Sequence, residues 1–224
     1  MEDNFILQLT CDGSHTLFLP DMDEHYHSTN GAIQEAKHVY IEAGLNQCRK
    51  EIIHVLEMGF GTGLNALLTA LEAEKRQINV RYTGLEKYPL SQEITDKLNY
   101  PEMPVIAGLT RNPLLLKTIH QAEWGKSEII TPYFHLNKIQ TDFRIFDFPE
   151  KYDVVYYDAF APGKQPEVWS QELFDKIYSA MNSGGLLTTY CAKGNIRRMM
   201  LQAGFMVERI PGPLGKREML RAIR

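Results

Sequence analysis

The sequence predicts an α/β fold with a mostly parallel seven-stranded sheet, an antiparallel C-terminal strand and an N-terminal β-hairpin extension. From residue 52 onward, short apolar runs alternate with amphipathic segments, as in sheets that helices cover on both faces. The last two apolar runs, 205–211 and 217–223, have no helix between them, which predicts a final antiparallel pair. Ligands of such sheets bind at the carboxyl ends of the strands.

The elements follow from local patterns. Apolar runs at 5–10 and 15–20 flank the turn signal Asp12-Gly13 and predict a hairpin. Apolar residues at helical spacing predict a helix over 31–43. The other predicted strands are 52–59, 79–88, 133–142, 151–158 and 184–191, and the other predicted helices are 63–76, a stretch from about 91, 113–122, 170–181 and 194–204. We divide the chain into an extension, 1–45, and a main domain, 46–224.

Composition is that of a soluble globular protein, with 44% hydrophobic and 23% charged residues. The N-terminus has no signal-peptide pattern and no apolar run is long enough to span a bilayer. Three isolated cysteines fit a reduced compartment. We therefore expect a cytoplasmic protein with no membrane partner, a monomer or a weak dimer.

Charge is distributed unevenly. The net charge is −4, but residues 193–224 carry eight Lys or Arg and two Glu, or +6, which leaves −10 for the rest of the chain. A basic C-terminal segment is typical of a nucleic-acid contact. A solvated surface with scattered charges is the alternative.

A glycine-rich segment, Glu57-Met-Gly-Phe-Gly-Thr-Gly-Leu-Asn65, joins a predicted strand to a predicted helix. Glycines let the backbone turn sharply and approach a ligand closely. The dinucleotide fingerprint G-x-G-x-x-G is broken by Leu64, where its last glycine would stand. The pattern acidic-x-G-x-G-x-G is typical of class I methyltransferases and predicts S-adenosylmethionine as cofactor. Its cofactor-binding candidates are Glu57, Gly59, Phe60, Gly61, Thr62, Gly63 and Asn65.

Acidic residues end two further predicted strands. We expect Glu86, with its neighbour Lys87, to accept hydrogen bonds from the ribose hydroxyls. Asp142 is assigned to the adenine amino group and Glu57 to the amino-acid end of the cofactor. The sequence does not decide which carboxylate contacts adenine and which contacts ribose. A surface carboxylate at a strand end is the alternative for each of the three.

Four segments carry a resemblance to a known family. They read "EMGFGTGLNALL" (57–68), "GLEKYPL" (84–90), "YYDAFAPGKQPEVWSQELF" (156–174) and "LQAGFMVERIPGPLGKREML" (201–220). With the stretch 26–45, they resemble the methyltransferase module of the bacterial MnmC-type tRNA-modifying enzymes. The resemblance covers nearly the whole chain and is weakest over 100–132.

The resemblance implies a Rossmann-like class I methyltransferase that methylates the amine of 5-aminomethyl-(2-thio)uridine at the wobble position of the tRNA anticodon stem-loop. In the bifunctional members this module is fused to an FAD-dependent oxidase; we expect a stand-alone enzyme without FAD. Tyr26 and Ser28, in the matching N-terminal stretch, are expected to close over the methionine end of the cofactor. The "HYH" at 25–27 lacks further ligands at metal spacing, so no metal is expected.

The apolar run 152–157 ends in Asp158, our candidate catalytic residue. A carboxylate at a strand end can orient an amine and receive its proton, whereas a loop cap is the alternative role. Phe160, Pro162 and Lys164 are expected to wall the substrate pocket, and Trp169 to stack on a base or pack in the core. The expected tRNA backbone contacts are Lys193, Arg197, Arg198, Lys216 and Arg217.

Two other functions remain open. A small-molecule amine methyltransferase or an aminopropyltransferase would use the same fold and glycine loop. A module that binds cofactor or tRNA without transferring methyl is the second alternative, although Glu57, Glu86 and Asp158 are all present.

Overall fold

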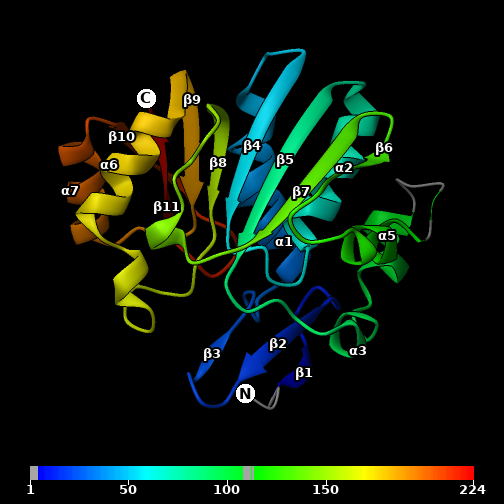
Figure 1. Ribbon diagram of the computed structural model, residues 1–224. Coiled ribbons are helices and arrows are strands. Elements are labelled where there is room, and N and C mark those ends of the chain that lie inside the picture. Colours follow the sequence, from blue (N-terminus) through cyan, green and yellow to red (C-terminus); the bar gives the residue numbers. More distant parts are fainter. Residues whose placement is uncertain (1–4, 108–111, 113) are drawn as a thin grey trace.

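The N-terminal segment folds into a small antiparallel sheet, set apart from the main sheet in the computed structural model, which describes residues 5–107, 112 and 114–224 (Figure 1). Its strands are β1 (Ile6–Leu9), β2 (His15–Leu19) and β3 (Glu24–His25), in the order β1-β2-β3. Asp12 fixes the β1–β2 turn, because its Oδ1 accepts hydrogen bonds from the Thr10 hydroxyl at 2.8 Å and the Ser14 amide at 3.0 Å. The predicted hairpin is confirmed, with a third strand added.

The main sheet has eight strands among the described residues, in the order β10-β11-β9-β8-β4-β5-β7-β6. The strands are β4 (Ile52–Met58), β5 (Asn79–Glu86), β6 (Ser127–Thr131), β7 (Phe134–Gln140), β8 (Tyr152–Tyr157), β9 (Met181–Thr189), β10 (Met206–Pro211) and β11 (Glu218–Ile223). The five central strands are parallel, and β6, β10 and β11 pair antiparallel.

The predicted α/β class and the C-terminal antiparallel pair are therefore confirmed, but the predicted count of seven strands is one too low. The additional strand is β6, an edge strand paired with β7 through an irregular register. The sequence of β6 lacks the apolar alternation that marks a covered strand, and none of its residues is fully buried in the structure.

Helices cover both faces of the main sheet. The α-helices of the described residues are α1 (Ala32–Ala36), α2 (Leu64–Arg76), α3 (Gln92–Thr95), α4 (Pro104–Ala107), α5 (Leu115–Gln121), α6 (Gln171–Ala180) and α7 (Gly194–Ala203), and α3 lies beside the small N-terminal sheet (Figure 1). Successive strand residues point to opposite faces, so Val55 and Tyr156 pack in the cluster with α1, α2 and α5. Leu56 and Tyr157 pack in the other cluster, with α6 and α7. The start of the helix predicted over 113–122 includes residue 113, which lies outside the described residues.

The helix predicted over 31–43 forms as α1 and continues as a π-helix, Lys37–Glu42. Its apolar side chains Ile33, Tyr40 and Ile41 are buried in the same cluster as the central strands and α2. This helix therefore shares the core of the main sheet. The boundary at 45/46 between extension and main domain remains a prediction, and residues 1–4 of that extension lie outside the described residues.

The order of the strands reverses at β4, which pairs with β5 on one side and with β8 on the other. A sheet of this kind places its ligand at the carboxyl ends of the strands near such a reversal. Figure 1 shows the small N-terminal sheet beyond these ends. Among the described helices, none is long and apolar enough to cross a membrane.

Candidate active site

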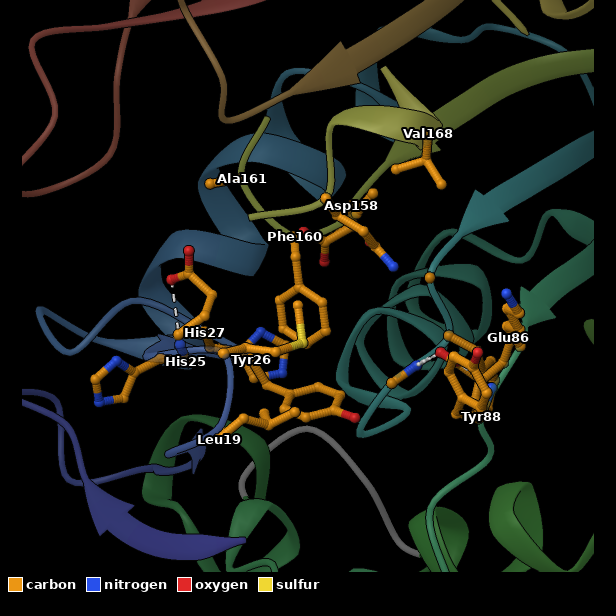
Figure 2. A pocket seen from close by; sticks show the side chains of 18 of the residues that line it. Leu19, His25, Tyr26, His27, Glu86, Tyr88, Asp158, Phe160, Ala161 and Val168 are labelled. Atoms are coloured by element: carbon orange, nitrogen blue, oxygen red, sulfur yellow. Dashed lines mark hydrogen bonds between the residues drawn. The ribbon is translucent and has the colours of Figure 1, made fainter. Parts of the chain in front are cut away.

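A cavity of about 820 Å³ lies at the carboxyl ends of the central strands. The glycine loop, the ends of β5, β7 and β8, and the N-terminal loop all contribute to its wall. Figure 2 shows Glu86 and Tyr88 on one side of the cavity and His25 on the other, with the rings of Tyr26 and Phe160 between them. The cavity thus brings together residues from both ends of the chain.

The glycine loop forms the floor of the cavity through conformations that suit glycine. Gly59 and Gly61 have φ of +100° and +48°. A Cβ on Gly59 would lie 2.6 Å from the carbonyl oxygen of Asp158, and one on Gly61 would lie 3.0 Å from Cδ1 of Tyr26. The loop therefore packs directly against the end of β8 and under the N-terminal loop. These close approaches explain why glycine stands at both positions.

Glu86, at the end of β5, faces this loop. Its carboxylate accepts hydrogen bonds from the Gly61 amide at 3.1 Å and the Tyr88 amide at 2.9 Å. Burial raises the pKa of Glu86, while these amides act in the opposite sense. The carboxylate is thus held in one orientation at the cavity wall, as a group that receives sugar hydroxyls requires.

Asp142 lies in the wall next to Glu86, after β7. Its carboxylate pairs with Arg144 at 2.6 Å and with Lys87 at 3.1 Å. The hydrogen bonds from Arg144 hold the pKa of Asp142 below its usual range, so the group is ionised at neutral pH. Glu86, Lys87 and Asp142, all predicted from the sequence, are brought together at one end of the cavity.

Asp158 follows β8 and faces the cavity from the opposite side of the glycine loop (Figure 2). The amide Nδ2 of Asn65 donates hydrogen bonds to Asp158 Oδ2 at 2.8 Å and to Glu57 Oε1 at 2.9 Å. Burial raises the pKa of Asp158 to about 6, although the bond from Asn65 opposes this rise. A group with this pKa near the operating pH is suited to accept and release a proton.

Glu57, expected from the loop motif to orient the amino-acid end of the cofactor directly or through water, does not line the cavity. Its side chain is fully buried, and burial raises its pKa well above the ordinary value. Its second oxygen has no hydrogen-bond partner within the described part of the chain. The structure therefore connects Glu57 to the site through Asn65. The buried residue Thr62 likewise lies behind the loop, where its hydroxyl contacts Nε2 of His27 at 2.6 Å.

The N-terminal loop forms a wall of the cavity with Tyr26 and Ser28. The Tyr26 ring packs edge-on against Phe160 with 5.1 Å between ring centroids. His25, at the end of β3, and His27 also line the cavity, and burial lowers the pKa of His27 to about 4. The described residues contain no group of three His, Cys, Asp or Glu side chains able to hold a metal.

The candidate substrate residues after Asp158 separate into two groups. Phe160 lines the cavity, whereas Pro162, Lys164 and Trp169 do not. Lys164 forms an ion pair with Asp23 at 3.2 Å, outside the cavity. Trp169 is 4% exposed, and its indole nitrogen donates to the Phe160 carbonyl at 2.8 Å. The structure thus places Trp169 in the core, where it supports the loop and has no free face for a base.

The basic residues of the C-terminal segment also lie in different surroundings. Lys193 caps α7, which carries Arg197 and Arg198, and Lys193 and Arg198 are exposed. Arg217 is exposed as well. Lys216, in contrast, lines the cavity and forms an ion pair with Glu35. The structure therefore leaves Lys193, Arg198 and Arg217 available to an external partner and directs Lys216 inward.

Several cavity residues were missed by the sequence reasoning, namely Glu35, Tyr88, Phe143, Arg144 and Tyr190. Arg144 stands two residues after Asp142, a spacing that suggests the observed pairing. Glu35 had a weaker signal, since it is an acidic residue within a stretch that otherwise reads as an apolar helix. Tyr190 follows a buried strand and gave no signal of its own.

The chain is similar to several known proteins. Residues 116–224 match a family described as S-adenosyl-L-methionine-dependent methyltransferase. The chain is 27% identical over 89% of its length to the tRNA 5-methylaminomethyl-2-thiouridine biosynthesis bifunctional protein MnmC of Pseudoalteromonas translucida, of which it covers 33%. It is 31% identical over 88% of its length to the MnmC protein of Aromatoleum aromaticum, of which it covers 32%. The chain thus spans about a third of the length of these relatives.

Solved structures support the fold. The crystal structure of MNMC2 from Aquifex aeolicus superposes with a TM-score of 0.79 at 24% identity, covering 99% of this chain and 70% of that one. Spermidine synthase from Thermotoga maritima has a TM-score of 0.53 at 8% identity, covering 100% and 80%. The C-terminal half of the chain thus matches the S-adenosyl-L-methionine-dependent methyltransferase family, the chain is similar to about a third of the MnmC relatives, and the solved structures show the same fold.

Proposed function

We propose that the protein transfers a methyl group from S-adenosylmethionine to the amine of 5-aminomethyl-(2-thio)uridine at the wobble position of tRNA, giving 5-methylaminomethyl-(2-thio)uridine. The observation that carries the proposal is the position of Asp158. It packs against the glycine loop and lines the cavity together with the aromatic rings of Tyr26 and Phe160. The choice of substrate is based on the MnmC relatives, which are named for 5-methylaminomethyl-2-thiouridine biosynthesis in tRNA. We place the reaction in the cytoplasm and treat the chain as a monomer or weak dimer.

The residues present fit the cofactor. Gly59 and Gly61 let the glycine loop pass close to Asp158 and Tyr26 where a Cβ would clash, and Glu86 offers a fixed carboxylate beside the loop. We assign the ribose to Glu86 and the adenine amino group to the ionised Asp142, with Lys87 holding Asp142 in place. Tyr26 and Ser28 close the cavity above the loop. When bound, S-adenosylmethionine supplies a methyl group on a positively charged sulfur.

Asp158 then performs the acid–base part of the reaction. A protonated amine has no lone pair, so Asp158 accepts a hydrogen bond from the neutral amine and aims its nitrogen. Methyl transfer would replace the carbon–sulfur bond by a carbon–nitrogen bond, so the sulfur would become neutral and the accepting group a positively charged secondary amine. This amine gives its extra proton to Asp158, directly or through water. Asn65 keeps the carboxylate oriented throughout.

The exposed residues Lys193, Arg198 and Arg217 are assigned to the tRNA backbone, with the half-buried Arg197 beside them on α7 and Lys164, which pairs with Asp23 outside the cavity, as further candidates. Contacts of this kind position the substrate and depend strongly on salt. We expect the double variant Arg198→Gln/Arg217→Gln to weaken tRNA binding at all sequences alike and to flatten its salt dependence. Unchanged affinity and salt slope would remove these residues from the assignment. The exposed pair Lys126 and Glu123, on another part of the surface, offers the matched control Lys126→Gln.

The deciding experiment is transfer of labelled methyl from S-adenosylmethionine to tRNA that bears 5-aminomethyl-uridine. Label in the wobble nucleoside with wild type, and a loss of about 10²–10⁴-fold with Asp158→Asn, supports both the substrate and the role of the carboxylate. Equal labelling of the tRNA by both proteins would support the proposed substrate but would show that Asp158 has only a structural role. No label in tRNA, with methylation or aminopropylation of free amines instead, would replace the proposal by the small-molecule function. Cofactor binding without any transfer would point to a non-catalytic module.

A further inference from the structure

An ion pair joins an N-terminal and a C-terminal segment of the chain in the wall of the cavity that Asp158 also lines. Glu35, on α1, is 8% exposed, and its Oε1 pairs with Nζ of Lys216 in the loop between β10 and β11. Its other oxygen accepts a hydrogen bond of 3.0 Å from the Ser28 amide. Glu35 therefore ties the N-terminal loop to the C-terminal hairpin, and both of its oxygens are used for this.

The partner of Glu35 is held in one place from a second side. Nζ of Lys216 lies 4.1 Å from the centre of the Tyr190 ring, a cation–π contact. The Tyr190 hydroxyl in turn donates to the Ala159 carbonyl at 2.8 Å, one residue from Asp158. Lys216, Tyr190, Glu35 and Asp158 all line the same cavity. The two contacts restrict the Lys216 ammonium to the cavity wall, whereas a lysine that serves only as a surface cation stays mobile in solvent.

We propose that Glu35 and Lys216 are positioning residues for the acceptor amine: Glu35 holds the Lys216 ammonium inside the cavity, where the ammonium disfavours a second positive charge on the incoming amine and offsets part of the effect of Glu35 on Asp158. This inference rests on the proposed function. A nearby positive charge disfavours a second one and favours a negative one. The same cation therefore acts on both partners of the proton transfer, without contact to the methyl group.

Asp158 faces charged and titratable groups from every element around it. They are Glu57 on β4, Tyr82 on β5, Glu35 on α1, Tyr40 on the π-helix, Tyr190 after β9 and Lys216 on the β10–β11 loop. Burial dominates the pKa of Asp158; among the charges, Glu35 acts to raise it and Lys216 to lower it. Of these groups, Lys216 is the cation. Removing Glu35 or Lys216 should therefore move the titration of Asp158 in opposite directions.

The test is the pH profile of kcat/KM for methyl transfer to tRNA bearing 5-aminomethyl-uridine, with Lys216→Met and Glu35→Gln. For Lys216→Met we expect the acid limb to move up by about one pH unit and the rate at neutral pH to fall at least tenfold. For Glu35→Gln we expect the acid limb to move down. Lys216→Arg, which keeps the charge, should retain the wild-type limb. The affinity for S-adenosylmethionine, measured by calorimetry, should change less than threefold in all three.

The matched control is the exposed pair of Glu93 on α3 and Lys97 just after it, which lies outside the cavity wall. Glu93→Gln and Lys97→Met should leave the profile unchanged. Acid limbs that stay in place, or that move in the same direction in both cavity variants, would overturn the proposal and leave the pair a structural tie. If Lys216→Met reduces tRNA affinity and its salt slope while the limb stays in place, Lys216 is a phosphate contact and the proposal is likewise wrong.

Two safeguards separate other failures from this one. If Glu35→Gln does not fold, Lys216→Met and Lys216→Arg still test the proposal. Both variants replace the lysine side chain, but only Lys216→Met removes the positive charge. A wild-type protein that transfers no methyl to tRNA would contradict the proposed function. In that case the pH dependence of methyl transfer to a free amine, with the same variants, tests the ion pair alone.

Discussion

The Asn65 side chain donates a 2.8 Å hydrogen bond to the carboxylate of Asp158, and the same nitrogen donates to the buried Glu57. Asn65 is 2% exposed and stands at the start of α2, so it is fixed by the helix and by the sheet. One amide thus orients two carboxyl groups that differ in role. Asp158 faces the cavity, while Glu57 lies behind it as a support.

This relationship predicts the effect of Asn65→Leu. Loss of the donor leaves the ionised form of Asp158 less stable, so its pKa rises further. We expect the acid limb of kcat/KM against pH to move up by about one unit, with stability lowered by about 1–3 kcal/mol because two buried acceptors lose their donor. Methyl-transfer kinetics across pH 5–8 and denaturant unfolding check this. An unmoved acid limb would mean that Asn65 only supports the fold.

Asp158→Asn should change how stability depends on pH. The pKa of Asp158 is raised to about 6, so between pH 4 and 6 the folded protein holds a proton that the unfolded chain has released. The free energy of unfolding therefore falls as pH rises through this range. The asparagine variant lacks this fall, so its loss of stability from pH 4 to pH 7 should be smaller by at most about 3 kcal/mol.

Denaturant unfolding of both proteins at pH 4 and pH 7 gives the required double difference. Differences of the same size in wild type and variant would show that Asp158 titrates as an ordinary carboxyl group. Circular dichroism at pH 4 should first confirm that both proteins are folded there.

Gly61→Ala should impair cofactor binding. The new Cβ meets the Tyr26 ring at 3.0 Å, and φ of +48° is strained for alanine. Since the Gly61 amide also orients Glu86, we expect the Kd for S-adenosylmethionine to rise at least tenfold. Gly184→Ala is the control, because Gly184 also has a positive φ, +74°, but its Cβ would meet no atom within 4 Å. Calorimetric titration should show the loss in the first variant alone.

Lys138→Met should remove a stability change at alkaline pH. Lys138 is 1% exposed; its Nζ donates to the His120 carbonyl at 2.7 Å and lies 4.8 Å from the Trp124 ring centre. Burial lowers its pKa to about 8, so between pH 8 and 10.5 the unfolded chain holds a proton that the folded protein has lost. The free energy of unfolding of wild type should therefore rise over this range.

In the methionine variant this rise should be absent, because no proton is exchanged on folding at this position. The exposed Lys126 gives the control Lys126→Met, which should keep the wild-type rise. A slope shared by wild type and Lys138→Met would show that Lys138 keeps its ordinary pKa in the fold.

Contiguous residues made much of this protein predictable. The glycine loop, Glu86 at the end of one strand and Asp158 at the end of another all follow from local patterns, because strand ends in a parallel sheet converge at one edge. The hairpin around Asp12 and the final antiparallel pair followed from turn residues and from the missing helix. Edge strand β6 was missed, since half-exposed residues carry no clear alternation.

The roles of single long side chains depended on packing instead. Nothing local distinguishes Lys216 from its neighbour Arg217, yet the fold directs the first to Glu35, 181 residues away, and leaves the second exposed. Trp169 has a ring that could stack on a base, but its indole nitrogen donates a hydrogen bond to the Phe160 carbonyl within the core. Sequence patterns report periodicity and chain neighbours, whereas burial and charge pairing arise between segments that only folding brings together.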